Sequence, residues 1–324
     1  MNRPRLCIVT PAFASANNGN WHTAARWQQF LSPVAQVDVD QAWHEQDAHA
    51  LIALHARRSA ESIARFHARY PRRPLALVLT GTDLYGDLQA GDAAARHSIE
   101  CASHLVVLQD EALQILPQAW RPRARVVVQS APRLVRRDGA RRSFDFVAAG
   151  HLRAVKDPLT LMRAARELPA ELGVRVLHIG GALDEALGRE AQRTMAECPH
   201  YRWLGGLPPG ATRRWIARAR ALVHMSLMEG GANVVIEAVR SEVPVLASCI
   251  DGNVGLLGRE YAGYFEAGDA TALAALMRRF QGDADFAARL RGQCMARSAR
   301  FAPQVEADAV RTLLADMLAP LGNA

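Results

Sequence analysis

The sequence predicts an α/β protein of two domains, each built around a parallel sheet. Short apolar runs of the length of buried strands alternate with amphipathic helical segments along the chain. This alternation is typical of βα units, in which helices connect parallel strands. The length of 324 residues favours two such domains over one. A polar, arginine-rich stretch, 131–142, interrupts the rhythm and is predicted to be the linker.

Six strands are expected in each half of the chain. In the first half they are predicted at Leu6–Thr10, Ala35–Val39, Ala50–Leu54, Leu75–Thr80, His104–Gln109 and Val126–Ser130. In the second half they are predicted at Phe144–Gly150, Val174–Gly180, Tyr201–Leu204, Ala221–Ser226, Val243–Ser248 and Gly263–Glu266. From Asp283 onward the chain is predicted to be helical, with Pro303 separating two helices of which Val305–Leu318 is the last. The expected domains are therefore 1–142 and 143–300, followed by a C-terminal helix in 301–324 that returns to the first domain.

Composition argues against several classes of function. The net charge is +7, but the basic residues are scattered and aromatic residues make up only 6% of the chain, so we expect no nucleic-acid partner. No run approaches the roughly 20 apolar residues of a membrane span, so stable membrane association is not expected. The five cysteines follow no metal-binding spacing, which predicts a reducing cytoplasm and no structural metal. The run from Leu6 to Val9 favours a buried strand, with a secretory signal as the alternative.

The loops after the strands are where the chemistry is expected, because ligands of open parallel sheets bind beyond the carboxyl ends of the strands. After the strand Ala221–Ser226, Gly230 and Gly231 are predicted to open the next helix with backbone amides that can receive a phosphate. Glu229 and Glu237 have seven residues between them, and each carboxylate can accept two hydrogen bonds from a diol. The alternative is that both glutamates are solvated surface residues.

A basic loop follows the first strand of the second half. It reads His151-Leu-Arg-Ala-Val-Lys-Asp-Pro158, with Pro158 at the first position of the next helix. Arg153 and Lys156 can neutralise a diphosphate there, or they are simply exposed charges. Lys156 is the one lysine among 39 basic residues. The basic loop, the Gly-Gly pair and the two glutamates together indicate a pocket for a nucleotide-diphosphate sugar.

Two loops of the first half are candidates for binding an anion. The segment Asn17-Asn-Gly-Asn20 precedes a helix predicted to begin near Trp21, and it either binds a ligand or forms a turn. The third strand ends in His55-Ala-Arg-Arg-Ser59, where Ser59 is a good helix N-cap. Arg57 and Arg58 would then lie beside a helix N-terminus, as an anion site or as a solvated basic turn.

These motifs resemble the donor-binding segment of the family 4 glycosyltransferases of the GT-B fold. The run from Ala219 to Ser248 contains a strand, Ser-x-x-Glu-Gly, a second glutamate after seven residues, and Pro-Val-Leu-Ala-Ser. The loop from Gly150 to Lys156 matches that family's Gly-Arg-x4-Lys pattern. The resemblance covers most of the chain. It implies two Rossmann-like domains with parallel sheets facing across a cleft, and a metal-independent enzyme that uses a UDP-sugar as substrate and needs no cofactor.

The resemblance also implies roles for particular residues. Lys156 and Arg153 would bind the donor diphosphate and stabilise the leaving UDP, and Glu229 would bind the hexose hydroxyls; these three are the predicted catalytic residues. Glu237 would bind the ribose hydroxyls. The remaining predicted donor-binding residues are His151, Gly230, Gly231, Ala232 and Asn233.

Two positions depart from the family pattern. His151 stands where the family has a phosphate-binding arginine, so Arg153 is expected to take over that task. Thr80 replaces the histidine of a frequent His-Gly-x-Asp pattern that ends here at Asp83. Because that histidine touches the donor sugar in the family, the resemblance does not carry donor selectivity to this chain.

A subgroup of the family, the selenosugar synthases of selenoneine biosynthesis, is more closely similar. The shared motifs are Leu79-Thr-Gly-Thr-Asp-Leu-Tyr85, His151-Leu-Arg-x-x-Lys-Asp-Pro158, Met228-Glu-Gly-Gly-Ala-Asn-Val and Gly252-Asn-Val-Gly-Leu-Leu-Gly258. This resemblance implies a UDP-hexose donor, expected to be UDP-N-acetylglucosamine, and selenophosphate as a small anionic acceptor. The predicted acceptor-binding residues are Asn18, Gly19, Asn20, Arg57, Arg58, Thr82 and Asp83.

The chemistry of this acceptor agrees with the residues. A soft, already ionised selenium nucleophile needs no general base, and no Ser-His-Asp or paired-acid arrangement is evident in the sequence. Three alternatives remain: a family 4 glycosyltransferase with an ordinary hydroxyl acceptor, a UDP-sugar epimerase, and a non-enzymatic basic binding protein. The epimerase would need acid and base carboxylates in the first domain, where Asp83 is the principal candidate.

Overall fold

The computed structural model describes residues 3–13, 19–134 and 143–319, which form two compact α/β units. Unit 1 comprises Met1–Gln129, Glu229–Gly231 and Pro303–Ala324, and unit 2 comprises Ser130–Met228 and Ala232–Ala302. The expectation of two α/β units with parallel sheets is confirmed. The domain boundary after residue 142 and most of the linker fall in 135–142, outside the described residues, so the boundary stays a prediction.

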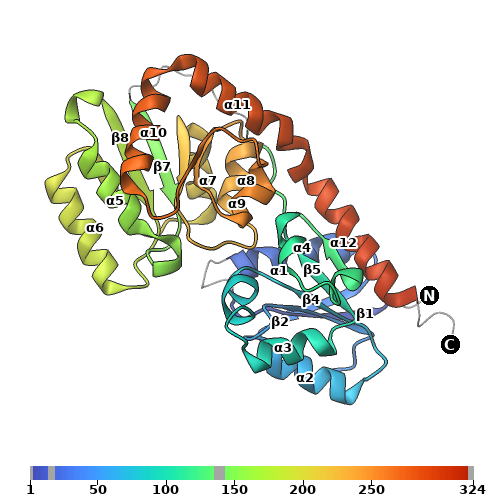
Figure 1. Cartoon of the computed structure of the whole chain (residues 1–324). Helices are drawn as coiled ribbons and strands as arrows, with labels where there is room; N and C mark the ends of the chain where they lie inside the picture. Colours follow the sequence, from blue (N-terminus) through green and yellow to red (C-terminus); the bar gives the residue numbers. More distant parts are fainter. Residues whose placement is uncertain (1–2, 14–18, 135–142, 320–324) are drawn as a thin grey trace. The chain divides into compact units, whose positions relative to one another are not determined.

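Unit 1 is built on a six-stranded parallel sheet of order β2-β1-β3-β4-β5-β6. Its strands are β1 (Arg5–Val9), β2 (Gln36–Asp40), β3 (Ala50–Leu54), β4 (Leu75–Val78), β5 (His104–Val107) and β6 (Ala124–Val126). Its helices are α1 (Gly19–Leu31), α2 (Ala60–Arg69), α3 (Ala93–Cys101), α4 (Glu111–Ile115) and α12 (Pro303–Leu318), with a π-helical turn η2 (Asp83–Asp87) and a 3₁₀ turn η3 (Arg121–Arg123) (Figure 1).

Unit 2 repeats this plan with a sheet of order β12-β11-β10-β7-β8-β9. Its strands are β7 (Phe144–Ala149), β8 (Val174–Ile179), β9 (Tyr201–Trp203), β10 (Ala221–His224), β11 (Val245–Ser248) and β12 (Tyr264–Phe265). Its α-helices are α5 (Pro158–Glu167), α6 (Glu185–Glu197), α7 (Pro209–Arg218), α8 (Asn233–Arg240), α9 (Asp251–Leu257), α10 (Ala270–Gly282) and α11 (Ala284–Ser298). Short 3₁₀ turns are η4 (Ala154–Lys156), η5 (Ala170–Leu172) and η6 (Ala299–Phe301).

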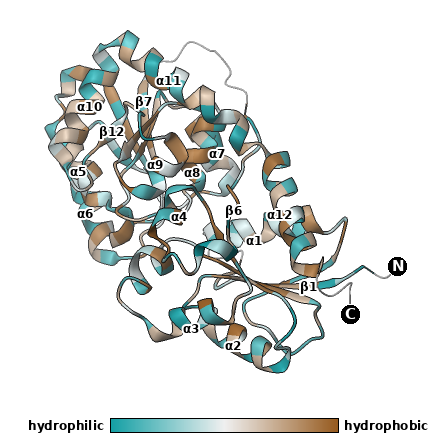
Figure 2. Ribbon diagram, turned by 45° about the vertical axis from the view of Figure 1, so that its right-hand side comes forward, coloured by the Kyte–Doolittle hydropathy of each residue, from teal (hydrophilic) through white to brown (hydrophobic). Residues whose placement is uncertain are grey.

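The strands form where they do because each central strand is buried on both faces. All five residues of β3 and all four of β4, β10 and β11 are buried. Such strands read as continuous apolar runs, because helices cover both sides of a parallel sheet. In Figure 2 the strands are coloured mostly as hydrophobic, whereas the exposed sides of the surrounding helices are hydrophilic.

The last strand of unit 1 was predicted in the wrong place. The expected strand was Val126–Ser130, but β6 covers Ala124–Val126, with Ala124 paired to Leu105 of β5. Its neighbour β5 ends at Val107, so the residues after Val126 have little of a paired strand beside them. The apolar run correctly predicted that these residues are buried, since Val127 is 2% exposed. It did not predict which of them pair with the neighbouring strand.

Helix α12 closes unit 1 by packing against α1, as Figure 1 shows. The carboxylate of Glu306 is 1% exposed and accepts hydrogen bonds from Trp27 Nε1 at 2.9 Å and Arg26 Nε at 3.0 Å. Such a buried carboxylate is tolerated only because its charge is paired and its oxygens are hydrogen-bonded. Arg125 of β6 also pairs with Asp316 of α12 at 2.7 Å.

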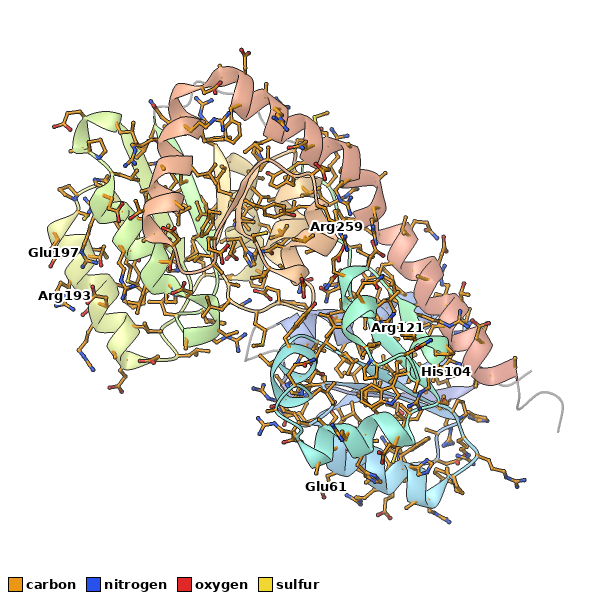
Figure 3. The ribbon with its side chains drawn as sticks, in the orientation of Figure 1. Glu61, His104, Arg121, Arg193, Glu197 and Arg259 are labelled. Carbon is orange, nitrogen blue, oxygen red and sulfur yellow. The ribbon has the colours of Figure 1, made fainter. Side chains whose placement is uncertain are left out.

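Charged side chains of α5 and α6 in unit 2 bind one another. Arg166 donates to Glu190 at 2.8 Å and to Glu197 at 2.7 Å, and Figure 3 labels Glu197 and Arg193 on α6. These side chains are partly exposed to solvent, and surface ion pairs contribute about 0–1 kcal/mol each. We therefore assign this cluster to the solvated surface and not to a binding site. Within the described ranges, no helix has the length and apolar character that a bilayer span requires.

A buried histidine makes the stability of unit 2 dependent on pH. His178 of β8 is 1% exposed, its Nδ1 lies 2.9 Å from the hydroxyl of Tyr201, and burial lowers its pKa to about 4. As the pH falls below about 6.5, the unfolded chain takes up a proton that the folded chain accepts only near pH 4. The stabilisation is therefore complete above pH 6.5 and is lost progressively down to pH 4.

We predict that His178 alone lowers the free energy of unfolding by about 3 kcal/mol between pH 7 and pH 4. Urea unfolding of the wild type and of His178→Gln at several pH values measures this, and the wild type should lose more stability than the variant over that window. The exposed His44→Gln variant is the control and should follow the wild type. Parallel pH profiles for the wild type and His178→Gln would contradict the prediction.

Candidate functional site

The strand order of unit 2 has its switch point between β7 and β10. From β7, the chain adds β8 and β9 on one side of the sheet and β10, β11 and β12 on the other. A position where the strand order reverses in this way is called a switch point. The loops that follow the two strands lead in opposite directions there, and the space between them is the usual ligand site of an open α/β sheet. The two loops concerned are 150–157 after β7 and 225–232 after β10. These loops carry most of the predicted donor-binding residues, and Asn233 and Glu237 lie on helix α8, which follows the second loop.

The loop after β7 carries the predicted lysine back over the end of its own strand. A Cβ built on Gly150 would lie 3.8 Å from Cγ and Cδ of Lys156, so the aliphatic stem of the lysine packs against this glycine. The turn η4 and Asp157, which has a φ of +43°, redirect the chain into α5. Pro158 occupies the first helical position, as predicted. The fold thus directs Lys156 to the switch point.

The loop after β8 contains a glycine pair that the sequence analysis overlooked. Gly180 has a φ of +154°, and a Cβ added to it would lie 1.9 Å from the carbonyl oxygen of Gly150. The two loops are joined by hydrogen bonds from Gly150 N to Ile179 O at 2.8 Å and from Leu152 N to Gly181 O at 2.9 Å. The warning in the sequence was Gly-Gly directly after an apolar run, which often marks a close backbone approach.

His151 lies beside this glycine pair. A Cβ added to Gly181 would lie 3.5 Å from its Nδ1, and that nitrogen is buried without a hydrogen-bond partner among the described residues. Buried polar atoms in native proteins are nearly always satisfied by protein, water or ligand. The position of His151 at the end of β7 is therefore compatible with its predicted place among the donor-binding residues.

The loop after β10 is tied to the lysine loop, and it begins its helix later than predicted. Leu227 N donates to Val155 O at 3.0 Å, which holds the two switch-point loops together. Helix α8 begins at Asn233, with Ala232 as its N-cap, so Gly230 and Gly231 precede the helix and do not form its first turn. The residues Glu229–Gly231 cluster with unit 1, and Glu229 is 8% exposed. Ala232 and Asn233 remain the residues at the N-terminus of α8.

Glu237 lies on the second turn of α8 and faces helix α7. Its Oε1 is 3.7 Å from Nε of Arg213, and the two side chains are 21% and 22% exposed. Arg213 also donates through Nη2 to the carbonyl of Pro132 at 2.8 Å. The predicted ribose-binding carboxylate is therefore half-buried and has a cationic neighbour that the sequence analysis did not identify.

A buried network supports these loops from β11. Ser248 donates through Oγ to the carbonyl of Ser226 at 2.6 Å, and Asn253 donates through Nδ2 to the carbonyl of Ser248 at 2.9 Å. Ser248 and Asn253 are both fully buried. The ends of β10, β11 and the start of α9 are thereby fixed relative to one another, and the loop that carries the glutamate motif starts from a rigid base.

In unit 1 the switch point lies between β1 and β3, since β2 is added on one side of β1 and β3 on the other. The loop after β1 leads to α1, which begins at Gly19, two residues before the predicted start. Gly19 and Asn20 thus form its first turn, where unpaired N–H groups face outward. Asn18 lies outside the described residues. The loop after β3 is His55–Ser59, so the topology brings the two predicted acceptor loops to one end of the sheet.

Asp83 holds the loops of unit 1 together and does not face a ligand. It is 0% exposed, and its carboxylate accepts hydrogen bonds from the backbone N–H groups of Ala56, Thr80, Gly81 and Leu84 at 2.8 to 3.0 Å. With both oxygens engaged and no exposed surface, it has no access to an acceptor. Asp83 therefore has a structural role in this loop and not the acceptor contact that the sequence predicted.

His55 and Thr82 form a pair beside this carboxylate. His55 has a φ of +74°, is 2% exposed, and its Nε2 lies 3.0 Å from Oγ1 of Thr82. Its Nδ1 accepts a hydrogen bond from Arg58 N at 3.4 Å, and burial lowers its pKa. A non-glycine residue with positive φ at the end of a central strand is a strained position of the kind that collects at functional sites.

The two arginines after β3 differ in their surroundings. Both are exposed, but Arg57 pairs with Asp87 at 3.1 Å. Ser59 precedes α2 but does not cap it, because its hydroxyl donates to Leu54 O at 2.7 Å instead. Of the two, Arg58 is therefore the better placed to meet a soluble anion. Among the described residues, no group of three or more His, Cys, Asp and Glu side chains is arranged to hold a metal ion.

Comparison with known proteins shows which proteins this chain resembles. Residues 137–293 match the family described as "Glycosyl transferases group 1". A glycosyltransferase 1 domain-containing protein 1 from Xenopus tropicalis is 27% identical over 214 residues, which cover 59% of this chain and 61% of that protein. The chain thus spans less than two thirds of the length of this relative.

Solved structures share the fold over almost the whole chain. Sucrose-phosphate synthase from Thermosynechococcus elongatus superposes with a TM-score of 0.81 at 15% identity, covering 98% of this chain and 100% of that one. HepE from Anabaena, solved with UDP and glucose, gives a TM-score of 0.77 at 14% identity, covering 97% and 100%. The pneumococcal O-GlcNAc transferase GtfA, solved with UDP and GlcNAc, gives 0.70 at 16% identity, covering 83% and 57%.

The two parallel six-stranded sheets and these neighbours define the fold as GT-B, which confirms the predicted fold class. The family match and the shared fold support a glycosyltransferase. The predicted family 4 motifs lie mainly in unit 2, and the matched residues 137–293 include them from His151 to Gly258.

We predict that Gly180→Ala lowers the free energy of unfolding by at least about 2 kcal/mol, because the new methyl group would meet the Gly150 backbone at a φ that alanine rarely adopts. Gly282→Ala is the matched control, since its added Cβ would meet no atom within 4 Å. Denaturant unfolding of both variants measures the difference. Equal stabilities for Gly180→Ala and the wild type would show that the two loops do not approach each other in this way.

Proposed function

We propose that the protein is a glycosyltransferase that uses a UDP-sugar as donor. The observation that carries the proposal is the meeting of the lysine loop after β7 with the loop after β10 at the switch point of unit 2. Arg153 and Lys156 belong to the first of these loops, and Glu237 belongs to the helix that follows the second; these are residue types that a nucleotide-diphosphate sugar requires. The proposed assignments are Arg153 and Lys156 to the diphosphate, Glu229 to the hexose, and Glu237 to the ribose.

In this proposal, positive charge drives departure of the leaving group. Negative charge accumulates on the β-phosphate as the bond between the anomeric carbon and UDP breaks. Lys156 and Arg153 stabilise that charge. His151, Gly230, Gly231, Ala232 and Asn233 complete the proposed donor contacts.

For the acceptor, we propose a small anion, with selenophosphate as the compound that the motif resemblance suggests and UDP-N-acetylglucosamine as the matching donor. The selenium lone pair would form the new bond to the anomeric carbon while UDP leaves with the electron pair of the broken C–O bond. No oxidant or base is needed, because the nucleophile is already ionised. The exposed Arg58 and the first turn of α1 at Gly19 and Asn20 support an anionic acceptor.

The geometry of Asp83 weighs against the epimerase alternative. That reaction would need carboxylates of the first domain that reach the sugar. The carboxylate of Asp83 is instead buried and used by four backbone N–H groups. The glycosyltransferase with an alcohol acceptor remains the rival, and the acceptor assay below decides between the two.

We predict that Lys156→Ala and Arg153→Ala each lower kcat for donor cleavage on the order of 100-fold at saturating UDP-sugar, because each removes charge that stabilises the departing diphosphate. UDP release is measured in a coupled assay, with calorimetric titration of UDP as a second readout. Arg163→Ala, which removes an exposed arginine from neighbouring α5, is the control and should keep full activity. Undiminished turnover in both loop variants would overturn the proposed role of the loop.

We predict that wild-type protein releases UDP from UDP-N-acetylglucosamine in the presence of selenophosphate prepared anaerobically, and does not with simple alcohols. Arg58→Ala should raise the KM for selenophosphate about tenfold, since a charge-assisted contact to a dianion is lost. Arg69→Ala, at the far end of α2, is the control. If UDP were released only with alcohols, the acceptor would be an alcohol and not selenophosphate. If an epimerised sugar formed without any acceptor, the protein would be an epimerase and not a glycosyltransferase.

A further inference from the structure

His55 joins two loops of unit 1 that carry predicted acceptor-binding residues. It directly follows β3, has a φ of +74°, and is 2% exposed. Its Nδ1 accepts a hydrogen bond from the backbone N–H of Arg58 at 3.4 Å, and its Nε2 lies 3.0 Å from Oγ1 of Thr82. One buried imidazole thus contacts the loop after β3 with one nitrogen and the loop after β4 with the other.

These contacts determine which nitrogen of His55 carries the proton. Burial lowers the pKa of His55 below its ordinary value, so the ring is neutral near pH 7. A neutral imidazole has one donor nitrogen and one acceptor nitrogen. Nδ1 is the acceptor, because it receives the Arg58 N–H and lies 3.9 Å from Oδ2 of Asp83, which is too far for it to donate there. Nε2 therefore carries the proton and donates it to Thr82.

This direction of donation leaves the hydroxyl proton of Thr82 for another acceptor. A threonine hydroxyl has a single proton, and its oxygen here receives the proton of His55. The hydroxyl proton then points away from the imidazole ring. In the part of the chain that the structure describes, Oγ1 of Thr82 has no second hydrogen-bond partner, and the residue is only half-buried. An oxygen of a small anion is a group that can accept this proton.

We propose that His55 is a positioning residue that orients the Thr82 hydroxyl to donate to an oxygen of the anionic acceptor. The inference rests on the proposed function, and it adds a residue to which the sequence analysis assigned no role. Thr82 touches the substrate in this proposal, and His55 acts only through it. Without His55 the hydroxyl would rotate freely, and ordering it on binding would cost free energy.

A purely structural role for His55 makes a different prediction, because its two nitrogens can be replaced separately. The side-chain amide of asparagine lies near the position of Nδ1, and that of glutamine lies near Nε2. His55→Asn can therefore keep the contact to Arg58 but not to Thr82, whereas His55→Gln can keep the contact to Thr82. Asparagine tolerates a positive φ better than glutamine, so an effect through stability alone favours His55→Asn. An effect through Thr82 favours His55→Gln.

The experiment measures the KM for selenophosphate at saturating UDP-N-acetylglucosamine, with UDP release as the readout. Thr82→Val should raise this KM about tenfold, the effect of one hydrogen bond to a charged group. The kcat and the KM for the donor should stay unchanged, because the contact is made equally before and during the reaction. His55→Asn should raise the KM for selenophosphate severalfold, and His55→Gln should stay closer to the wild type. In the Thr82→Val background, neither change at His55 should raise it further.

A second measurement needs no substrate. Nitrogen-15 spectra of the imidazole rings distinguish the two neutral tautomers, and comparison with His55→Gln assigns the signal of His55. We expect the proton on Nε2 in the wild type. A proton on Nδ1 would overturn the inference, because the Thr82 hydroxyl would then donate to the ring.

Two exposed residues provide matched controls. Thr271→Val, on α10, is the control for Thr82→Val, and His97→Asn, on α3, is the control for His55→Asn. Both controls should keep the wild-type KM for selenophosphate.

Several outcomes would overturn the inference and leave the proposed function intact. They are a wild-type KM in His55→Asn, and a higher KM in His55→Gln than in His55→Asn. A wild-type KM in Thr82→Val would overturn it as well, and this variant serves if the changes at His55 do not fold. Absence of selenophosphate turnover by the wild type would instead overturn the proposed acceptor, and this inference with it.

Discussion

The close approach of two backbones, at Gly150 and Gly180, is the constraint on which the proposed donor site depends. The two residues follow adjacent parallel strands, and an added Cβ at Gly180 would overlap the Gly150 carbonyl oxygen. Without side chains at this point, the loops after β7 and β8 pack directly on each other. The stem of Lys156 then lies along Gly150, and the lysine is directed by the fold and not by chance contacts of a flexible loop.

Unit 1 achieves the same rigidity with a carboxylate. Asp83 is fully buried, yet its charge is offset by four backbone N–H donors from the loops after β3 and β4. Because hydrogen bonds to a charged group are stronger than those between neutral groups, the side chain and the loops stabilise one another. The π-helical turn that begins at Asp83 and the positive φ of His55 are the backbone shapes that this anchor maintains. An acidic residue in a loop motif can thus be structural even where the motif is functional.

The sequence was sufficient to predict the two sheets, because buried parallel strands are continuous apolar runs. Such runs, and the helical segments between them, can be recognised directly in the sequence. It predicted the loops that carry Lys156 and Glu229 for the same reason, since each loop follows such a run. The sequence could not predict where strand pairing ends, because that depends on the length of the neighbouring strand. The predicted position of β6 was therefore wrong. The start of α8 was placed too early because the Gly-Gly pair resembles a helix opening, whereas the helix begins only at Asn233.

Side-chain roles were harder to predict than loop positions, because they depend on partners from distant segments. Asp83 and Glu237 are both acidic residues of recognised motifs, yet one is sealed by backbone donors and the other faces an arginine 24 positions earlier in the chain. Nothing in the residues near Arg213 distinguishes it from Arg214, which is exposed on the same helix. Only the packing of α7 against α8 makes one of them a neighbour of the glutamate.

The pairing of Arg213 with Glu237 also bears on a problem that faces any carboxylate in a diphosphate site. A carboxylate repels phosphate, and the repulsion is stronger where water is partly excluded. A cation beside Glu237 offsets part of this repulsion, since Nε of Arg213 lies 3.7 Å from its Oε1. Arg213 can do this because its other contact, to the Pro132 carbonyl, carries no net charge and leaves its positive charge available. In such a site, the selectivity of a carboxylate for a hydroxyl over a phosphate depends on the charge placed behind it.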